Sequence, residues 1–74
     1  MIHIYGKDSC DYCNAAKKLC EEQGAEYTYY FINQDISVED FVEKFPGKRT
    51  IPQITKDDEY VGGYAELQKL LLKP

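Results

Sequence analysis

Residues 2–24 read IHIYGKDSCDYCNAAKKLCEEQG and decide the fold of this chain. Residues 1–5 alternate as in a strand with Ile2 and Ile4 on one face, and Gly6 ends the alternation. Beyond a short polar segment, mostly apolar side chains recur at helical spacing, at Tyr12, Ala16, Leu19, Cys20 and Gln23. Gly24 follows as a left-handed cap, so this stretch predicts a helix that begins near Cys10 and ends at Gly24.

Residues 26–33 are rich in aromatic and β-branched side chains and predict a second strand. A strand, a helix and a strand of these lengths imply a parallel pair joined by a right-handed crossover. Ser37 and Asp40 resemble a capping pair ahead of a second helix, which ends at Pro46-Gly47. The apolar positions of this helix are Val38, Phe41, Val42 and Phe45.

Two short strands, around 53–55 and 60–61, flank the polar turn over residues 56–59 and predict a hairpin. A last helix then has an apolar face made by Tyr64, Leu67, Leu70 and Leu71. The order is βαβαββα, an α/β fold with a four-stranded mixed sheet. We expect a single domain over residues 1–74.

Composition narrows the possible functions. The 74 residues carry a formal charge of −4 without a basic stripe, so neither nucleic acid nor an anionic membrane is an expected partner. No apolar run approaches the roughly 20 residues that span a bilayer. Met1 leads straight into the first strand, which indicates no signal peptide and a cytoplasmic location, where thiols stay reduced.

The strongest chemical signal is Cys10-Asp11-Tyr12-Cys13, placed between a strand and a helix. The free N–H groups and the dipole of a helix N-terminus stabilise a thiolate, which makes Cys10 the expected nucleophile. Lys7 adds a positive charge, and Asp8 and Asp11 oppose it. Cys13, one turn later, points back toward Cys10 and is the expected resolving thiol.

The cysteines could instead form a stabilising disulfide or a zinc site. A disulfide across three positions closes too short a loop to stabilise the fold much. A zinc site needs four ligands, and the only further candidates are His3 and Cys20, of which Cys20 lies about 15 Å along the helix from Cys10. We therefore expect no metal, a core role for Cys20 and no catalytic role for His3.

Two further motifs allow alternative interpretations. In Arg49-Thr50-Ile51-Pro52-Gln53, the proline either simply begins a strand or forms a cis bond that turns the backbone of Ile51 toward an extended peptide. Gly62-Gly63 is either a plain turn or the start of a helix that binds an anionic group.

Together, the Cys-x-x-Cys after the first strand, Thr-Ile-Pro-Gln before the hairpin and Val-Gly-Gly-Tyr before the last helix resemble a dithiol glutaredoxin. This family belongs to the thioredoxin-fold superfamily, and the resemblance runs from Ile2 to about Leu71. It implies a glutathione-dependent thiol-disulfide oxidoreductase that reduces protein disulfides and glutathione mixed disulfides. It also implies glutathione as co-substrate, no resident metal and a monomer.

The resemblance assigns roles by position. Cys10 would attack the disulfide and Cys13 would complete the dithiol cycle. The residues that it implies for glutathione are Lys7 and Arg49 for the glycine carboxylate, Tyr12 and Thr50 along the groove, Ile51 and a cis Pro52 for the cysteine backbone, Gly62, Gly63 and Tyr64 for the γ-glutamyl carboxylate, and Glu66 for its amine.

Three departures from the family pattern concern charge. Asp11 follows the nucleophile where an uncharged residue is usual, the second helix carries Glu39, Asp40 and Glu43, and Ala65 stands where Asp or Ser is frequent. Two alternatives therefore stay open. One is a redoxin that is recharged by thioredoxin reductase and donates electrons to ribonucleotide reductase. The other is an iron–sulfur cluster carrier, which the second cysteine disfavours.

Overall fold

The fold follows the predicted order βαβαββα. The computed structural model describes residues 1–72. Its strands are β1 (Ile2–Gly6), β2 (Tyr27–Phe31), β3 (Gln53–Lys56) and β4 (Glu59–Gly62), and its helices are α1 (Asp11–Glu22), α2 (Val38–Lys44) and α3 (Tyr64–Leu71). In this part of the chain, no helix has both the length and the apolar character needed to cross a membrane.

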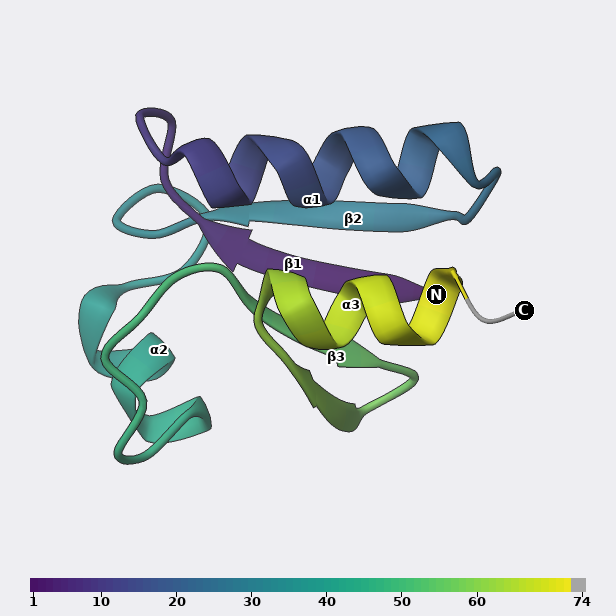
Figure 1. The fold of residues 1–74 in the computed structure, drawn as a ribbon. Helices are drawn as coiled ribbons and strands as arrows, with labels where there is room; N and C mark the ends of the chain where they lie inside the picture. The colour runs from purple at the N-terminus through teal and green to yellow at the C-terminus, as the bar shows by residue number, and fades with distance from the viewer. Residues whose placement is uncertain (73–74) are drawn as a thin grey trace.

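The strands form one mixed sheet in the order β2-β1-β3-β4. β1 is parallel to β2, and the β1–β3 and β3–β4 pairs are antiparallel. The parallel β1–β2 pair and the β3–β4 hairpin are therefore both confirmed. Figure 1 shows α1 lying along β2 and α3 crossing β1 and β3, while α2 stands apart near the ends of β1 and β2.

The main core lies between the sheet and the helices α1 and α3. Strand pairing places Ile4 between Tyr29 on β2 and Ile54 on β3. Ile4 and Ile54 are completely buried, as are Ala16 and Cys20 on α1 and Leu67 on α3. The prediction that Cys20 is a core residue is therefore confirmed.

The ends of α1 explain its length. Gly24 has a φ of 67°, and its N–H group donates to the carbonyl of Glu21 while the N–H of Ala25 donates to that of Cys20. This pair of bonds is a Schellman motif, which confirms the predicted glycine cap. The predicted apolar stripe was wrong at its first position, because Tyr12 is 65% exposed and Cys13 is buried instead.

A second apolar cluster lies under α2. Phe41 and Phe45 are buried there with Tyr5 and Ile32. Val38 and Val42 are exposed, which corrects the predicted four-residue apolar face of this helix. The physical reason is that α2 has only seven residues and packs along a single edge, so positions on its other edge find no neighbouring element to cover them.

The hairpin turn owes its shape to two acidic residues. Asp57 and Asp58 both have positive φ, at 50° and 72°, which is the arrangement of a type I′ turn. Aspartate tolerates this left-handed region better than most residues because its short side chain bonds locally. The turn therefore joins β3 and β4 tightly.

We expect Leu67→Ala to lower the free energy of unfolding by about 2–5 kcal/mol, because a fully buried leucine is lost and a cavity remains. Leu72→Ala is the matched control, since Leu72 ends the same helix and is 49% exposed. Urea denaturation of both variants measures the difference. Equal losses in the two variants would show that α3 is not packed as described.

Candidate active site

Cys10 occupies the N-cap position of α1, as the sequence predicts. Its sulfur accepts a hydrogen bond from the backbone N–H of Cys13 at 3.1 Å. The two cysteines are joined as a disulfide, with their Cα atoms 5.1 Å apart. Cys10 is half-buried and Cys13 is fully buried, so the sulfur of Cys10 is the one that a substrate can reach.

Gly6 allows α1 to approach β1 closely. A Cβ atom at Gly6 would lie 2.5 Å from the hydroxyl oxygen of Tyr29 and closer still to the sulfur of Cys13. No side chain fits in this space, so the first turn of α1 rests on the end of β1. The sequence predicts only that the strand ends at Gly6, because a close approach between residues far apart in the chain produces no local sequence pattern.

The loop between β1 and α1 is held from two sides. The hydroxyl of Tyr29 donates to the carbonyl oxygen of Lys7 at 3.0 Å, and the side-chain amide of Asn14 donates to that of Asp8 at 3.3 Å. These bonds fix the backbone that leads to Cys10. The side chain of Lys7 remains exposed beside it.

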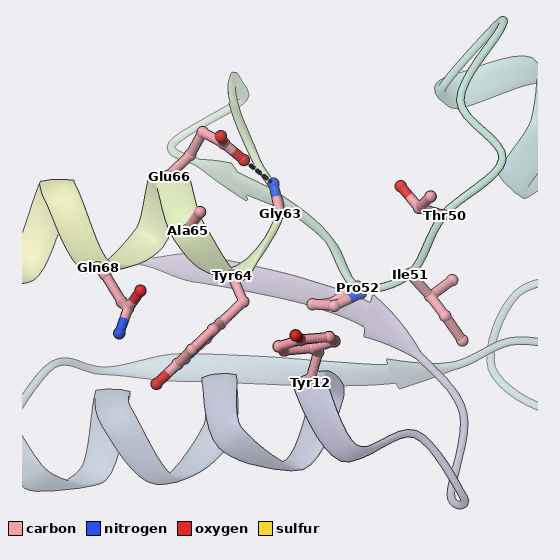
Figure 2. Close-up of a pocket in the computed structure, with 9 residues that line it drawn as sticks. All are labelled: Tyr12, Thr50, Ile51, Pro52, Gly63, Tyr64, Ala65, Glu66 and Gln68. Atoms are coloured by element: carbon pink, nitrogen blue, oxygen red, sulfur yellow. Dashed lines mark hydrogen bonds between the residues drawn. The ribbon is translucent and has the colours of Figure 1, made fainter.

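A groove of about 510 Å³ lies between α1, the segment before β3 and the start of α3. Its lining consists of Tyr12, Thr50, Ile51, Pro52, Gly63, Tyr64, Ala65, Glu66 and Gln68. Figure 2 shows the rings of Tyr12 and Tyr64 on one side of the groove, and their centroids are 5.9 Å apart.

The Ile51-Pro52 peptide bond is cis. The sulfur of Cys10 lies 3.9 Å from the carbonyl oxygen of Ile51. Cys10 is therefore beside the segment that contains Ile51 and Pro52.

The buried side chain of Gln53 holds this segment in place, a role that the sequence did not predict. Its side chain is buried, and its amide group donates to the backbone carbonyl of Thr50 at 2.7 Å. Its carbonyl oxygen accepts from the hydroxyl of Tyr60 at 2.6 Å. Because both ends of the buried amide are bonded, Gln53 holds the groove wall in one conformation.

The carboxylate of Glu66 caps the N-terminus of α3. The backbone N–H of Gly63 donates to Glu66 at 2.8 Å, which is half of a capping box. Bonds from backbone N–H groups keep the pKa of Glu66 below its ordinary value. Gly62 is buried with a φ of 128°, where a Cβ would lie 2.7 Å from the Glu66 side chain. The Gly63 N–H is thus already bonded to Glu66, and Gly62 lies outside the groove lining.

Lys7 and Arg49 line a second hollow of about 310 Å³, and Ile51 is common to both cavities. Lys48 adds a third positive charge to this hollow, and the exposed Val38 and Val42 contribute an apolar side. Lys48 and the groove residue Gln68 were both missed in the sequence, although Gln68 stands one helical turn after Tyr64.

Residues 1–72 contain no group of three or more His, Cys, Asp or Glu side chains placed to hold a metal ion. Burial, with Glu21 nearby, raises the pKa of the Cys20 thiol, which suits its place in the core.

Cys10 at the N-terminus of a helix, with Cys13 buried one turn later, is an arrangement typical of thiol-disulfide oxidoreductases. The family model described as Glutaredoxin matches residues 2–61. The chain therefore belongs to the glutaredoxin family, and it is a disulfide oxidoreductase.

Relatives and solved structures agree with this assignment. Glutaredoxin 3 of Escherichia coli is 32% identical over 69 residues, which cover 93% of this chain and 83% of that protein. The structure of glutaredoxin 1 from Francisella tularensis, solved as a complex with cacodylate, has a TM-score of 0.74 to this chain at 30% sequence identity. The match covers 97% of this chain and 96% of the Francisella chain. Buckwheat glutaredoxin, solved with glutathione, shares the fold, with a TM-score of 0.74 at 24% identity, covering 93% of this chain and 66% of its own.

The capping role of Glu66 predicts a pH dependence. A carboxyl whose pKa is lower in the folded state stabilises the fold above its unfolded value of about 4.5, and this contribution is lost as the pH falls through the folded pKa. We expect Glu66→Gln to unfold at lower urea concentration than the parent at pH 7, and the difference to disappear in acid. Glu59→Gln on β4 is the control, and identical behaviour of the two variants at both pH values would contradict the capping role.

Proposed function

We propose that this protein is a dithiol glutaredoxin that uses glutathione to reduce protein disulfides and glutathione mixed disulfides. The observation that carries the proposal is the placement of Cys10, half-exposed at the N-terminus of α1 beside the groove, with Cys13 buried behind it. The thiolate of Cys10 attacks a substrate disulfide and forms a mixed disulfide, and one substrate sulfur leaves as a thiol.

The dithiol cycle then closes in two steps. Cys13 attacks the Cys10 sulfur, so the second substrate sulfur leaves reduced and the Cys10–Cys13 disulfide forms. Two glutathione molecules return this disulfide to the dithiol and become glutathione disulfide, which balances the two electrons given to the substrate. A glutathione mixed disulfide needs only Cys10, because a further glutathione can release the bound one.

Local charge and hydrogen bonding support Cys10 as the nucleophile. The N–H of Cys13 points at its sulfur, and the remaining N–H groups of the first turn of α1 favour negative charge there. Lys7 adds to this effect, and the exposed Asp11 opposes it.

The two cavities support a single extended ligand such as glutathione. In this arrangement the γ-glutamyl carboxylate meets the N–H groups of Tyr64 and Ala65, which lie in the first turn of α3 and have no acceptor within the helix. The γ-glutamyl amine faces Glu66, and the cysteine pairs with the backbone of Ile51.

The other end of the ligand lies in the second hollow. There the glycine carboxylate reaches Lys7 and Arg49, both of which line that cavity. Tyr12, Thr50 and Pro52 complete the groove wall. Of the positions that the family pattern suggests, Gly63 already donates its N–H to Glu66, and Gly62 is not among the residues that line the groove.

One alternative function has an observation in its favour. Glu39, Asp40 and Glu43 are exposed on α2 beside the second hollow, where they would repel part of the glutathione anion. An acidic face of this kind is compatible with a redoxin that takes electrons from thioredoxin reductase and passes them to ribonucleotide reductase. We propose a cytoplasmic monomer in either case.

The source of electrons separates these two functions. We expect steady turnover of a mixed-disulfide substrate when glutathione, glutathione reductase and NADPH are supplied. Thioredoxin reductase with NADPH, assayed in parallel, should give less than about a tenth of that rate. Consumption of NADPH measures both rates, and the opposite ranking would favour the alternative function.

The cysteine roles predict a split between two activities. Cys13→Ser should keep most of the activity on glutathione mixed disulfides, because that route needs only Cys10, and should lose dithiol reduction of protein disulfides. Cys10→Ser should lose both activities by at least about 100-fold. Mass spectrometry of the reduced Cys13→Ser protein after incubation with glutathione disulfide should find one glutathione on Cys10, with the other released as a thiol. Its presence on Cys20 instead would contradict the assignment.

A further inference from the structure

The hydroxyl of Tyr29 and the sulfur of Cys13 flank the same point in the structure. Both would collide with a Cβ atom on Gly6, so both lie close to this glycine. Tyr29 lies opposite Ile4 in the parallel β1–β2 register, which directs its side chain to the face of the sheet that α1 covers. Cys13 reaches the same place from the first turn of α1.

The ring of Tyr29 is held firmly in this position. The ammonium group of Lys17, one helical turn after Cys13, lies 4.6 Å from the ring centroid. The ring of Phe31 packs beside it with a centroid distance of 4.8 Å. With the hydroxyl bonded to the Lys7 carbonyl, the side chain is fixed at both ends.

A buried Cys13 poses an electrostatic problem that Tyr29 is placed to solve. Cys13 must become a thiolate to attack the mixed disulfide, yet its side chain has no exposed surface where water could solvate the charge. A buried anion without a hydrogen-bond donor is strongly disfavoured. The backbone N–H of Cys13 is directed at the sulfur of Cys10 and therefore cannot serve its own side chain.

We propose that the Tyr29 hydroxyl is the hydrogen-bond donor that stabilises the Cys13 thiolate during the resolving step. A hydroxyl rotates about its C–O bond, so the proton now given to the Lys7 carbonyl can turn toward the sulfur when the negative charge forms. This inference rests on the resolving role of Cys13 in the proposed function. Burial and the nearby Asp8 raise the pKa of Tyr29, which keeps the hydroxyl protonated and able to donate.

The step balances without any change in Tyr29. The Cys13 thiolate attacks the Cys10 sulfur of the mixed disulfide, the Cys10–Cys13 bond forms and the bond from Cys10 to the substrate sulfur breaks. The substrate sulfur is reduced and takes a proton from water, and the cysteine pair is oxidised. Of the charged groups that face Tyr29, Lys17 on α1 favours the thiolate and Asp8 in the preceding loop opposes it.

Tyr29→Phe tests the proposal because it removes the hydroxyl and keeps the ring. The reduced protein is mixed with the aromatic disulfide 5,5′-dithiobis(2-nitrobenzoic acid), which releases one coloured thiol when Cys10 attacks and a second when Cys13 resolves the mixed disulfide. We expect Tyr29→Phe to slow the second release about five- to tenfold more than the first at neutral pH, and to move the pH profile of the second release upward.

Tyr27→Phe is the matched control. Tyr27 lies two positions earlier on the same strand and face, and its hydroxyl donates to Glu21 at 2.6 Å, away from the cysteine pair. Both release phases should be unaffected in this variant. Cys13→Ser should show only the first phase, which assigns the phases to the two cysteines.

Three results would overturn the inference. The first is an unchanged second phase in Tyr29→Phe, and the second is an equal slowing of both phases, which would mean that Tyr29 acts only by holding the Lys7 loop. The third is an equal effect in Tyr27→Phe. The assay contains no glutathione, so its result does not depend on whether glutathione is the reductant of this protein. A first phase that is absent in Cys10→Ser and present in Cys13→Ser confirms the roles of the two cysteines independently.

Discussion

The contact between the first turn of α1 and the end of β1 controls the arrangement of this active site. It is made at Gly6, where any side chain would collide with the Cys13 sulfur. Because α1 can come this close, Cys13 is sealed from solvent while Cys10, three residues earlier, stays at the N-cap and at the mouth of the groove. The absence of a side chain at Gly6 thus allows one cysteine to be buried and the other to remain accessible.

The groove depends on a second constraint of a different kind. The segment before β3 is irregular, and its position comes from a single buried amide, Gln53, which bonds Thr50 on one side and Tyr60 on the other. A buried polar group is costly when unpaired and rigid when fully paired. Rigidity in this segment therefore derives from hydrogen bonding, whereas rigidity at Cys13 derives from close packing.

The sequence predicted the features that arise from local patterns. The order of helices and strands, the glycine cap at Gly24 and the hairpin each depend on residues within a few positions of one another, and all three were found. The errors and omissions involve residues that meet across the fold. Cys13 is buried where the sequence predicted Tyr12, because spacing alone does not reveal which side of a helix faces a sheet. The close approach of both Tyr29 and Cys13 to Gly6 involves two strands and a helix, and no local pattern shows it.

Charge is distributed in a way that the net value of −4 conceals. Glu39 and Asp40 occupy the first turn of α2 behind the Ser37 cap, where the helix dipole stabilises negative charge, so both have a structural explanation. Lys7, Lys48 and Arg49 line one hollow beside Ile51, although the ammonium of Lys48 also lies 5.2 Å from the ring centroid of Tyr60. Like charges in one place repel one another, and an anion bound between them relieves this repulsion. The proposed binding of a ligand carboxylate in this hollow is therefore compatible with an acidic protein, because the positive charge is local to the hollow.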